Sequence, residues 1–133
     1  MTRPLIHEEL TSLDRQAVRA LASTAKDLPP PEQAAEFGAC FDGFGEAELV
    51  LLGEATHGTS EFYRARAAIS RHLIQNHGFN IVAVEADWPD AARIDRYVRH
   101  AGKADGEREA FARFPTWMWR NEEMLEFVHW LRG

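Results

Sequence analysis

Two short apolar runs flank one amphipathic run in the middle of the chain, and this order limits the folds that the chain can adopt. The runs read Leu-Val-Leu-Leu from position 49 and Ile-Val-Ala-Val from position 81, and a carboxylate follows each, Glu54 and Glu85. Buried strands of parallel sheets are short and apolar throughout, and helices connect them. The pattern therefore predicts an α/β fold with a strand-helix-strand parallel core: strand 48–53, helix 60–76 and strand 80–86.

Helices are predicted before and after this core in the sequence. Helical spacing and capping residues predict them over residues 7–25, 32–41, 87–100, 107–113 and 117–131, the last capped by Thr116. Pro29-Pro30-Pro31 cannot continue a helix and favours an extended connection. We therefore divide the chain into an N-terminal helix with a proline linker (1–31) and an α/β portion (32–133).

The predicted sheet is too small for the helices that surround it. Two parallel strands leave two unpaired edges and cannot cover helices on both faces. The last predicted helix also carries Trp117, Trp119 and Trp130, which need a surface to pack against. We therefore expect the N-terminal part of a larger three-layer α/β/α domain.

Composition excludes several classes of function. The 133 residues carry a net charge of -6, which argues against a nucleic-acid partner, because phosphate binding needs a basic face. No run approaches the roughly 18 apolar residues that span a membrane, and the N-terminus has no apolar signal region. The single cysteine, Cys40, allows no disulfide within the chain. We expect a cytoplasmic protein without a nucleic-acid or membrane partner, and its oligomeric state stays open.

Polar residues follow both predicted strands and suggest an active site. The carboxyl ends of parallel strands lie side by side, so Glu54, His57, Glu85 and Asp87 are expected at one rim of the sheet. An imidazole with a pKa of about 6.5 can act as a general base near neutral pH, and a nearby carboxylate would orient it. The alternatives are a loop histidine that bonds the backbone, a solvated Glu85 and an Asp87 that caps the next helix.

Arg66 is predicted to turn inward. At 100° per residue it falls in one stripe with Phe62, Ile69 and Leu73, while Arg64 and Arg71 fall on the opposite, solvated face. An arginine that faces a core needs an acidic partner. Glu54 and Glu85 are the nearest candidates, and the alternative is a buried stem with the charged end in water.

Other chemistries find weaker support. The segment Gly53 to Ser60 resembles a phosphate-binding loop, but Thr59 stands where the essential lysine would be. No Gly-x-Ser-x-Gly elbow occurs, and Ser60 is interpreted as a helix-start residue. His72 and His77 are five residues apart and are predicted to point to different faces. We expect no cofactor, and a divalent metal held by Glu54, His57 and Glu85 stays open as an alternative.

Several spaced motifs resemble the erythromycin esterase family. They are Leu52-Gly-Glu-Ala-Thr-His-Gly-Thr-Ser-Glu-Phe62, Arg66, Gly78-Phe79, Val84-Glu-Ala-Asp87, Trp117 and Trp130-Leu-Arg132. The resemblance spans roughly residues 48 to 132. It implies an ester hydrolase, best known for macrolide lactones and antibiotic resistance, in which His57 activates water beside Glu54, Arg66 and Glu85. Glu61 and Asp87 lie in these motifs and Trp88 follows directly, and all three are candidate substrate-binding residues.

The resemblance leaves two functions open. Members of the family are much longer and supply further catalytic residues, including another histidine, from beyond the point where this chain ends. The first hypothesis is hydrolysis of a small-molecule ester. The second is a truncated, inactive remnant that binds a small molecule or a protein partner. A nucleotide-binding module is the third and weakest hypothesis.

Overall fold

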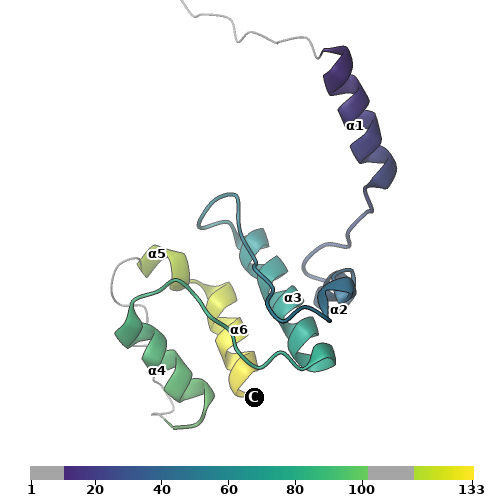
Figure 1. The fold of residues 1–133 in the computed structure, drawn as a ribbon. Coiled ribbons are helices and arrows are strands. Elements are labelled where there is room, and N and C mark those ends of the chain that lie inside the picture. Colours follow the sequence, from purple (N-terminus) through teal and green to yellow (C-terminus); the bar gives the residue numbers. More distant parts are fainter. Residues whose placement is uncertain (1–10, 102–115) are drawn as a thin grey trace, which may run out of the picture.

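Helices are the regular elements of the part of the chain that the structure describes. The structure, a computed structural model, describes residues 11–101 and 116–133, and the side chains of Thr116 and Trp117 lie outside this description. Its elements are α1 (Ser12–Thr24), α2 (Ala34–Ala39), the 3-10 helix η1 (Asp42–Phe44), α3 (Ser60–His77), α4 (Trp88–Val98), α5 (Thr116–Trp119) and α6 (Glu122–Arg132) (Figure 1). No helix in the described ranges has the length and apolar character needed to cross a membrane.

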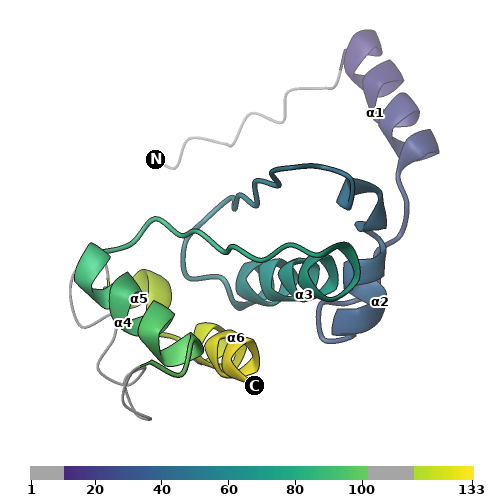
Figure 2. The same ribbon diagram turned by 60° about the horizontal axis from the view of Figure 1, so that its bottom comes forward.

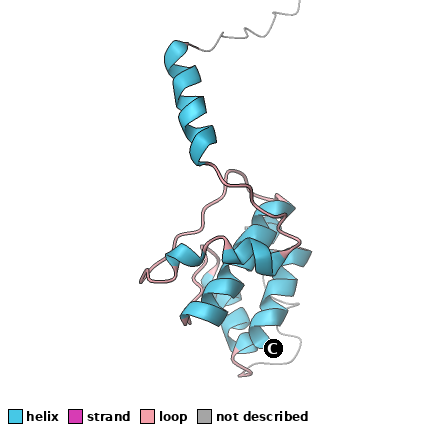
Figure 3. Cartoon of the chain, turned by 90° about the vertical axis from the view of Figure 1, so that its right-hand side faces the viewer, coloured by secondary structure: helices cyan, strands magenta, loops and turns pink. Residues whose placement is uncertain are grey.

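The predicted α/β core is wrong. Neither described range contains a β-strand (Figure 3), and both apolar runs are extended segments without sheet pairing. The segments cross the same side of α3 (Figure 2), yet Leu51 is 83% exposed and Ile81 is 79% exposed. Two strands alone are marginal in water, because a sheet needs further strands to satisfy its edges. An apolar, β-branched run thus favours extended backbone but cannot supply its own pairing partner.

The central helix α3 follows the sequence closely. The predicted helix from residue 60 to 76 is confirmed as Ser60–His77. Gly78 ends it with φ 75°, a left-handed conformation that glycine adopts without steric cost, and its N–H donates to the carbonyl of Leu73. Glu61 in the first turn and His77 in the last suit the helix dipole.

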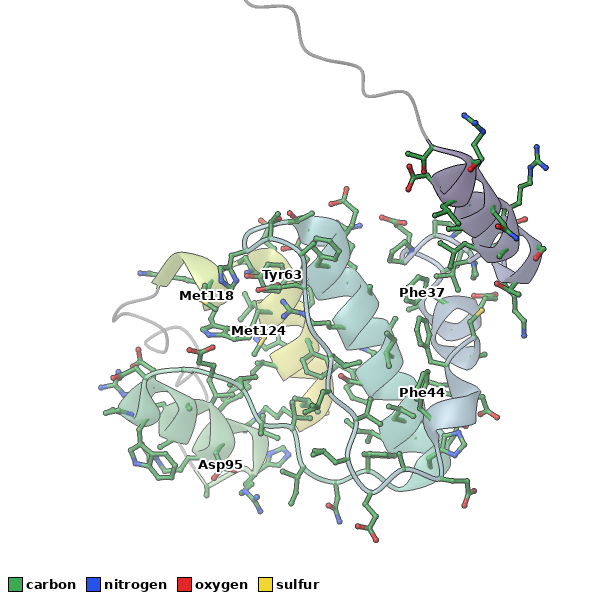
Figure 4. The ribbon with its side chains drawn as sticks, turned by 45° about the horizontal axis from the view of Figure 1, so that its top comes forward. Phe37, Phe44, Tyr63, Asp95, Met118 and Met124 are labelled. Atoms are coloured by element: carbon green, nitrogen blue, oxygen red, sulfur yellow. The ribbon has the colours of Figure 1, made fainter. Side chains whose placement is uncertain are left out.

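Helix α2 packs on one face of α3. Phe37 from α2 contacts the buried α3 residues Ala68, Ile69 and Leu73, and Phe37 is labelled beside α3 in Figure 4. Gly38 allows the close approach, because a Cβ there would stand 2.8 Å from the carbonyl oxygen of Ala68. The position therefore admits no side chain without moving the two helices apart.

Valine at position 38 is expected to lower the free energy of unfolding by about 1–3 kcal/mol, the usual cost of overpacking. Its Cβ would also stand 2.8 Å from the Cβ of His72, closer than ordinary van der Waals contact. Urea unfolding would measure the loss. Gly43→Val is the matched control, because nothing lies within 4 Å of a Cβ at Gly43. Equal losses in both variants would contradict the prediction.

Helices α5 and α6 complete the second half of the core. Tyr63 of α3 and Trp119 of α5 are buried together with the partly buried Met118 and Met124, and three of these residues are labelled in Figure 4. The prediction of one helix over 117–131 is wrong. Asn121 takes extended angles between α5 and α6, and its Oδ1 accepts the N–H of Met124 at 2.8 Å, so it caps a new helix.

Two further predictions about this half need revision. Arg71 is not solvated, since its guanidinium lies 5.2 Å from the ring centre of Trp130. The helix predicted over 87–100 is present as Trp88–Val98, with Asp87 at the N-cap position and Pro89 in the first turn. The helix predicted over 107–113 and the capping role of Thr116 lie outside the described residues.

Helix α1 stands apart from the rest of the described chain (Figure 1). It begins with a capping box in which Thr11 and Asp14 bond each other, and none of its residues is buried. Residues 7–10 of the predicted helix lie outside the described range. Residues 25–28, which lead into the proline run, are not helical.

Candidate functional site

A short loop between Gly53 and Thr59 presents the candidate base. Its turn passes through Gly58, whose φ of 78° is left-handed and favours glycine. The hydroxyls of Thr56 and Thr59 lie 2.8 Å apart and tie the loop to the start of α3. His57 therefore sits on a compact turn that is anchored to a helix.

His57 is hydrogen-bonded to Glu54. The contact joins Nδ1 of His57 to Oε1 of Glu54, and the His57 side chain is 50% exposed while that of Glu54 is 10% exposed. In a neutral imidazole an Nδ1–H that donates to a carboxylate leaves the lone pair on Nε2. An imidazole in this tautomer can accept a proton from water at Nε2.

Arg66 holds the other oxygen of the same carboxylate. Its Nη2 lies 2.8 Å from Oε2 of Glu54, without the alignment of a directed hydrogen bond, so the contact is an ion pair. The Arg66 side chain is 20% exposed. The inward position predicted from periodicity is therefore present. Glu54 bridges the two basic side chains and cannot turn toward either without leaving the other.

Aromatic rings support Arg66 from beneath. Its guanidinium carbon lies 4.8 Å from the ring centre of Tyr63 and 5.8 Å from that of Trp119. The two rings meet edge to face, and the indole N–H of Trp119 donates to the carbonyl of Glu85 at 2.9 Å. Cation–π contacts of this kind favour the charged arginine and fix its plane. The packing of Trp119 against Tyr63 therefore helps to hold the Arg66–Glu54 ion pair in place.

Glu85 does not join the site through its side chain. Only its backbone carbonyl is engaged, and the residue is exposed. The expected rim is wrong in this respect, because the described chain has no sheet whose strand ends could bring the carboxylates together. A metal site of Glu54, His57 and Glu85 is likewise not assembled among the described residues.

The three candidate substrate-binding residues have different surroundings. Glu61 is exposed in the first turn of α3, and Trp88 is exposed at the start of α4. Asp87 is partly buried at the N-cap position of α4, with no side-chain hydrogen bond to the helix end. All three residues follow the loop in the sequence, Glu61 in the first turn of α3 and the other two beyond the end of α3.

Ser60 and Glu123 form a contact that the sequence did not predict. The Ser60 hydroxyl donates to Glu123 Oε1 and lowers the pKa of that carboxyl, and Arg64 Nε lies 3.8 Å away. This contact joins the first turn of α3 to the first turn of α6. Sixty-three residues separate the two partners, so no local pattern could have indicated it. The contact of Tyr63 with Arg66, in contrast, could have been predicted from the sequence, because Tyr63 precedes Arg66 by about one helical turn.

An apolar groove lies away from this polar cluster. Its volume is about 700 Å³, and both extended runs line it together with α3 residues such as Leu73 and Ile74. None of Glu54, His57 and Arg66 borders it. Hydrolytic chemistry needs the base and its carboxylate, so the polar cluster is the candidate active site.

Comparisons with known proteins relate the chain to one family of enzymes. The erythromycin esterase family model matches residues 74–133. Erythromycin esterase type I of Escherichia coli is 35% identical over 63 residues, which are 47% of this chain and 16% of that protein. The resemblance to the erythromycin esterase family is confirmed. Erythromycin esterase type II of Escherichia coli is 28% identical over 88 residues, 66% of this chain and 20% of that protein. No solved structure matches the chain significantly.

The similarity to the erythromycin esterases covers only a small part of those proteins. The aligned segments span 16% and 20% of the length of the two esterases. The family match includes Glu85 and begins after Glu54, His57 and Arg66. The family model therefore relates residues 74–133 to the esterases, and the alignment with the type II enzyme also includes residues 46–88, which every 88-residue stretch of this 133-residue chain contains. The roles of the three clustered residues are argued from their geometry.

Proposed function

We propose that the site hydrolyses an ester, with His57 as the general base. The bridging position of Glu54 carries the proposal, because one carboxylate orients the imidazole and is itself held by Arg66. An oriented, half-exposed imidazole is suited to general-base catalysis. Confirmed kinship with the erythromycin esterases supports an ester as the substrate class.

The proposed hydrolysis begins with the transfer of a proton from water to His57. His57 Nε2 takes a proton from water as the water oxygen attacks the ester carbonyl carbon. The tetrahedral intermediate then expels the alkoxide, which takes the proton from His57 and leaves as an alcohol. Glu54 stabilises the transient imidazolium by accepting its Nδ1–H. We assign Arg66 to positioning Glu54, because its guanidinium lies behind that carboxylate and over two aromatic rings.

Glutamine at position 54 is expected to reduce ester hydrolysis by about a hundredfold or more, because the amide neither fixes the Nδ1–H tautomer nor stabilises imidazolium. A panel of chromogenic esters and a macrolide lactone would measure the rates. Glu46→Gln is the matched control, eight residues away and exposed. Wild-type rates in Glu54→Gln, or no hydrolysis by the unaltered protein, would contradict the proposal.

Binding without catalysis is the second candidate function. The observation that favours it is the apolar groove beside α3, which has the size of a small-molecule site. A hydrophobic ligand that binds the groove while no ester is hydrolysed would support this alternative. Leu51→Asp, which places a charge in the groove lining at an exposed position, would then abolish binding.

A further inference from the structure

Three potential metal ligands meet at the end of α3 remote from His57. Nε2 of His72 lies 3.0 Å from Oδ1 of Asp42, and Nε2 of His77 lies 2.7 Å from the same oxygen. The prediction that His72 and His77 point to different faces is wrong. Both rings contact the Asp42 carboxylate, which η1 places over the last turns of α3. The imidazole centres are 5.5 Å apart.

We propose that Asp42, His72 and His77 bind one divalent transition-metal ion of the zinc type. One ligand atom from each side chain lies within 4.8 Å of the other two. Zinc bonds of about 2.0–2.2 Å to nitrogen and oxygen place ligand atoms in a tetrahedron roughly 3.4 Å apart. The two oxygen–nitrogen separations of 3.0 and 2.7 Å would widen by about 0.4 and 0.7 Å on binding, and the 65% exposed Asp42 side chain can move by that much.

The ligand chemistry selects the class of ion. Two imidazole nitrogens with one carboxylate suit Zn²⁺, Co²⁺, Ni²⁺ or Cu²⁺. Ca²⁺ and Mg²⁺ prefer six or more oxygen ligands, which the cluster does not provide. Three protein ligands leave a fourth position for water.

Neighbouring groups hold both imidazoles in place. Asn76 Nδ2 lies 3.2 Å from Nδ1 of His72 and also donates to the His72 carbonyl. With a metal on Nε2 the ring proton moves to Nδ1, and the Asn76 amide turns over to accept it. His77 lies against Gly45, where a Cβ would stand 2.0 Å from its Nδ1. The absence of a side chain at Gly45 thus makes room for the ring.

The site is distinct from the proposed ester-hydrolysing site. His72 and His77 belong to the last turns of α3, whereas His57 and Glu54 precede its first turn. The bound ion would join η1 to α3, two elements linked in the described chain through the Asp42 side chain. Metal binding should therefore affect the stability of this end of the molecule.

The experiment is a titration of the chelator-treated full chain with Zn²⁺ by calorimetry, and with Co²⁺ by visible absorption. One ion per chain, tetrahedral Co²⁺ bands and a raised melting temperature are expected. Asp42→Asn and His77→Ala should each weaken Zn²⁺ binding by about tenfold to a hundredfold or more. Asp42 is exposed, so the asparagine variant should fold, and circular dichroism would check this.

His100→Asn is the matched control. It removes a surface imidazole remote from the cluster, and asparagine tolerates the φ of 57° found there. Unchanged Zn²⁺ affinity in this variant would support the assignment. No stoichiometric binding, equal losses in His100→Asn, or full affinity in both cluster variants would overturn it.

Discussion

Alanine in place of His57 is expected to lower the rate of ester hydrolysis by about 10²–10⁴-fold, the usual contribution of a positioned general base. The substitution leaves Glu54 and Arg66 paired, so the free energy of unfolding should change by less than about 1 kcal/mol at this half-exposed position. Steady-state rates on the most reactive ester of a panel would measure the loss. The loss should fall on kcat more than on KM, because the base acts in the transition state.

Added imidazole should restore part of the activity of His57→Ala. The cavity left by the ring opens to solvent, so a free imidazole can reach the vacated position. His129→Ala is the control, since it removes another exposed imidazole on α6. Hydrolysis by His57→Ala at the rate of the unaltered protein would exclude the proposed base.

Leucine in place of Arg66 is expected to lower the free energy of unfolding by about 3 kcal/mol, because it leaves the nearly buried Glu54 carboxylate without its cation. The leucine would also lose the contacts with Tyr63 and Trp119. Urea unfolding followed by tryptophan fluorescence would measure the change. Arg64→Leu is the matched control, because Arg64 is exposed and its pairing with Glu32 at 3.2 Å contributes less than about 1 kcal/mol.

A double-mutant cycle separates the ion pair from the packing. Glu54→Leu combined with Arg66→Leu removes both charges, and such replacements are often close to neutral. The double variant should therefore be more stable than the sum of the single effects indicates. Strictly additive effects would show that Glu54 and Arg66 do not interact.

The sequence predicted local structure better than long-range pairing. The bounds of α3, its end at Gly78 and the inward Arg66 followed from helical periodicity and glycine conformation, which depend on neighbours in the chain. The sheet was wrong because strand pairing depends on partners that no apolar run specifies. The break at Asn121 was missed although its capping bond to Met124 spans only three residues.

Part of the candidate site could also be predicted from the sequence. Glu54 and His57 are three residues apart in one loop, so their contact is local. Glu123 and Trp119 reach the site from more than fifty residues away, and only the packing of α5 and α6 on α3 brings them there. The pairing of His72 with His77 was missed because Asp42, on a separate element, is what brings them together.

The isolation of α1 affects how unfolding of this protein should be interpreted. Helices of about 12–15 residues are only marginally stable in water without packing, and the 13 residues of α1 bury none of their side chains. The helix–coil equilibrium of α1 is therefore independent of the cooperative transition that melts the core. All four tryptophans lie at position 88 or later. Fluorescence follows the core alone, whereas far-ultraviolet circular dichroism adds a gradual, non-cooperative melting of α1 to the same curve.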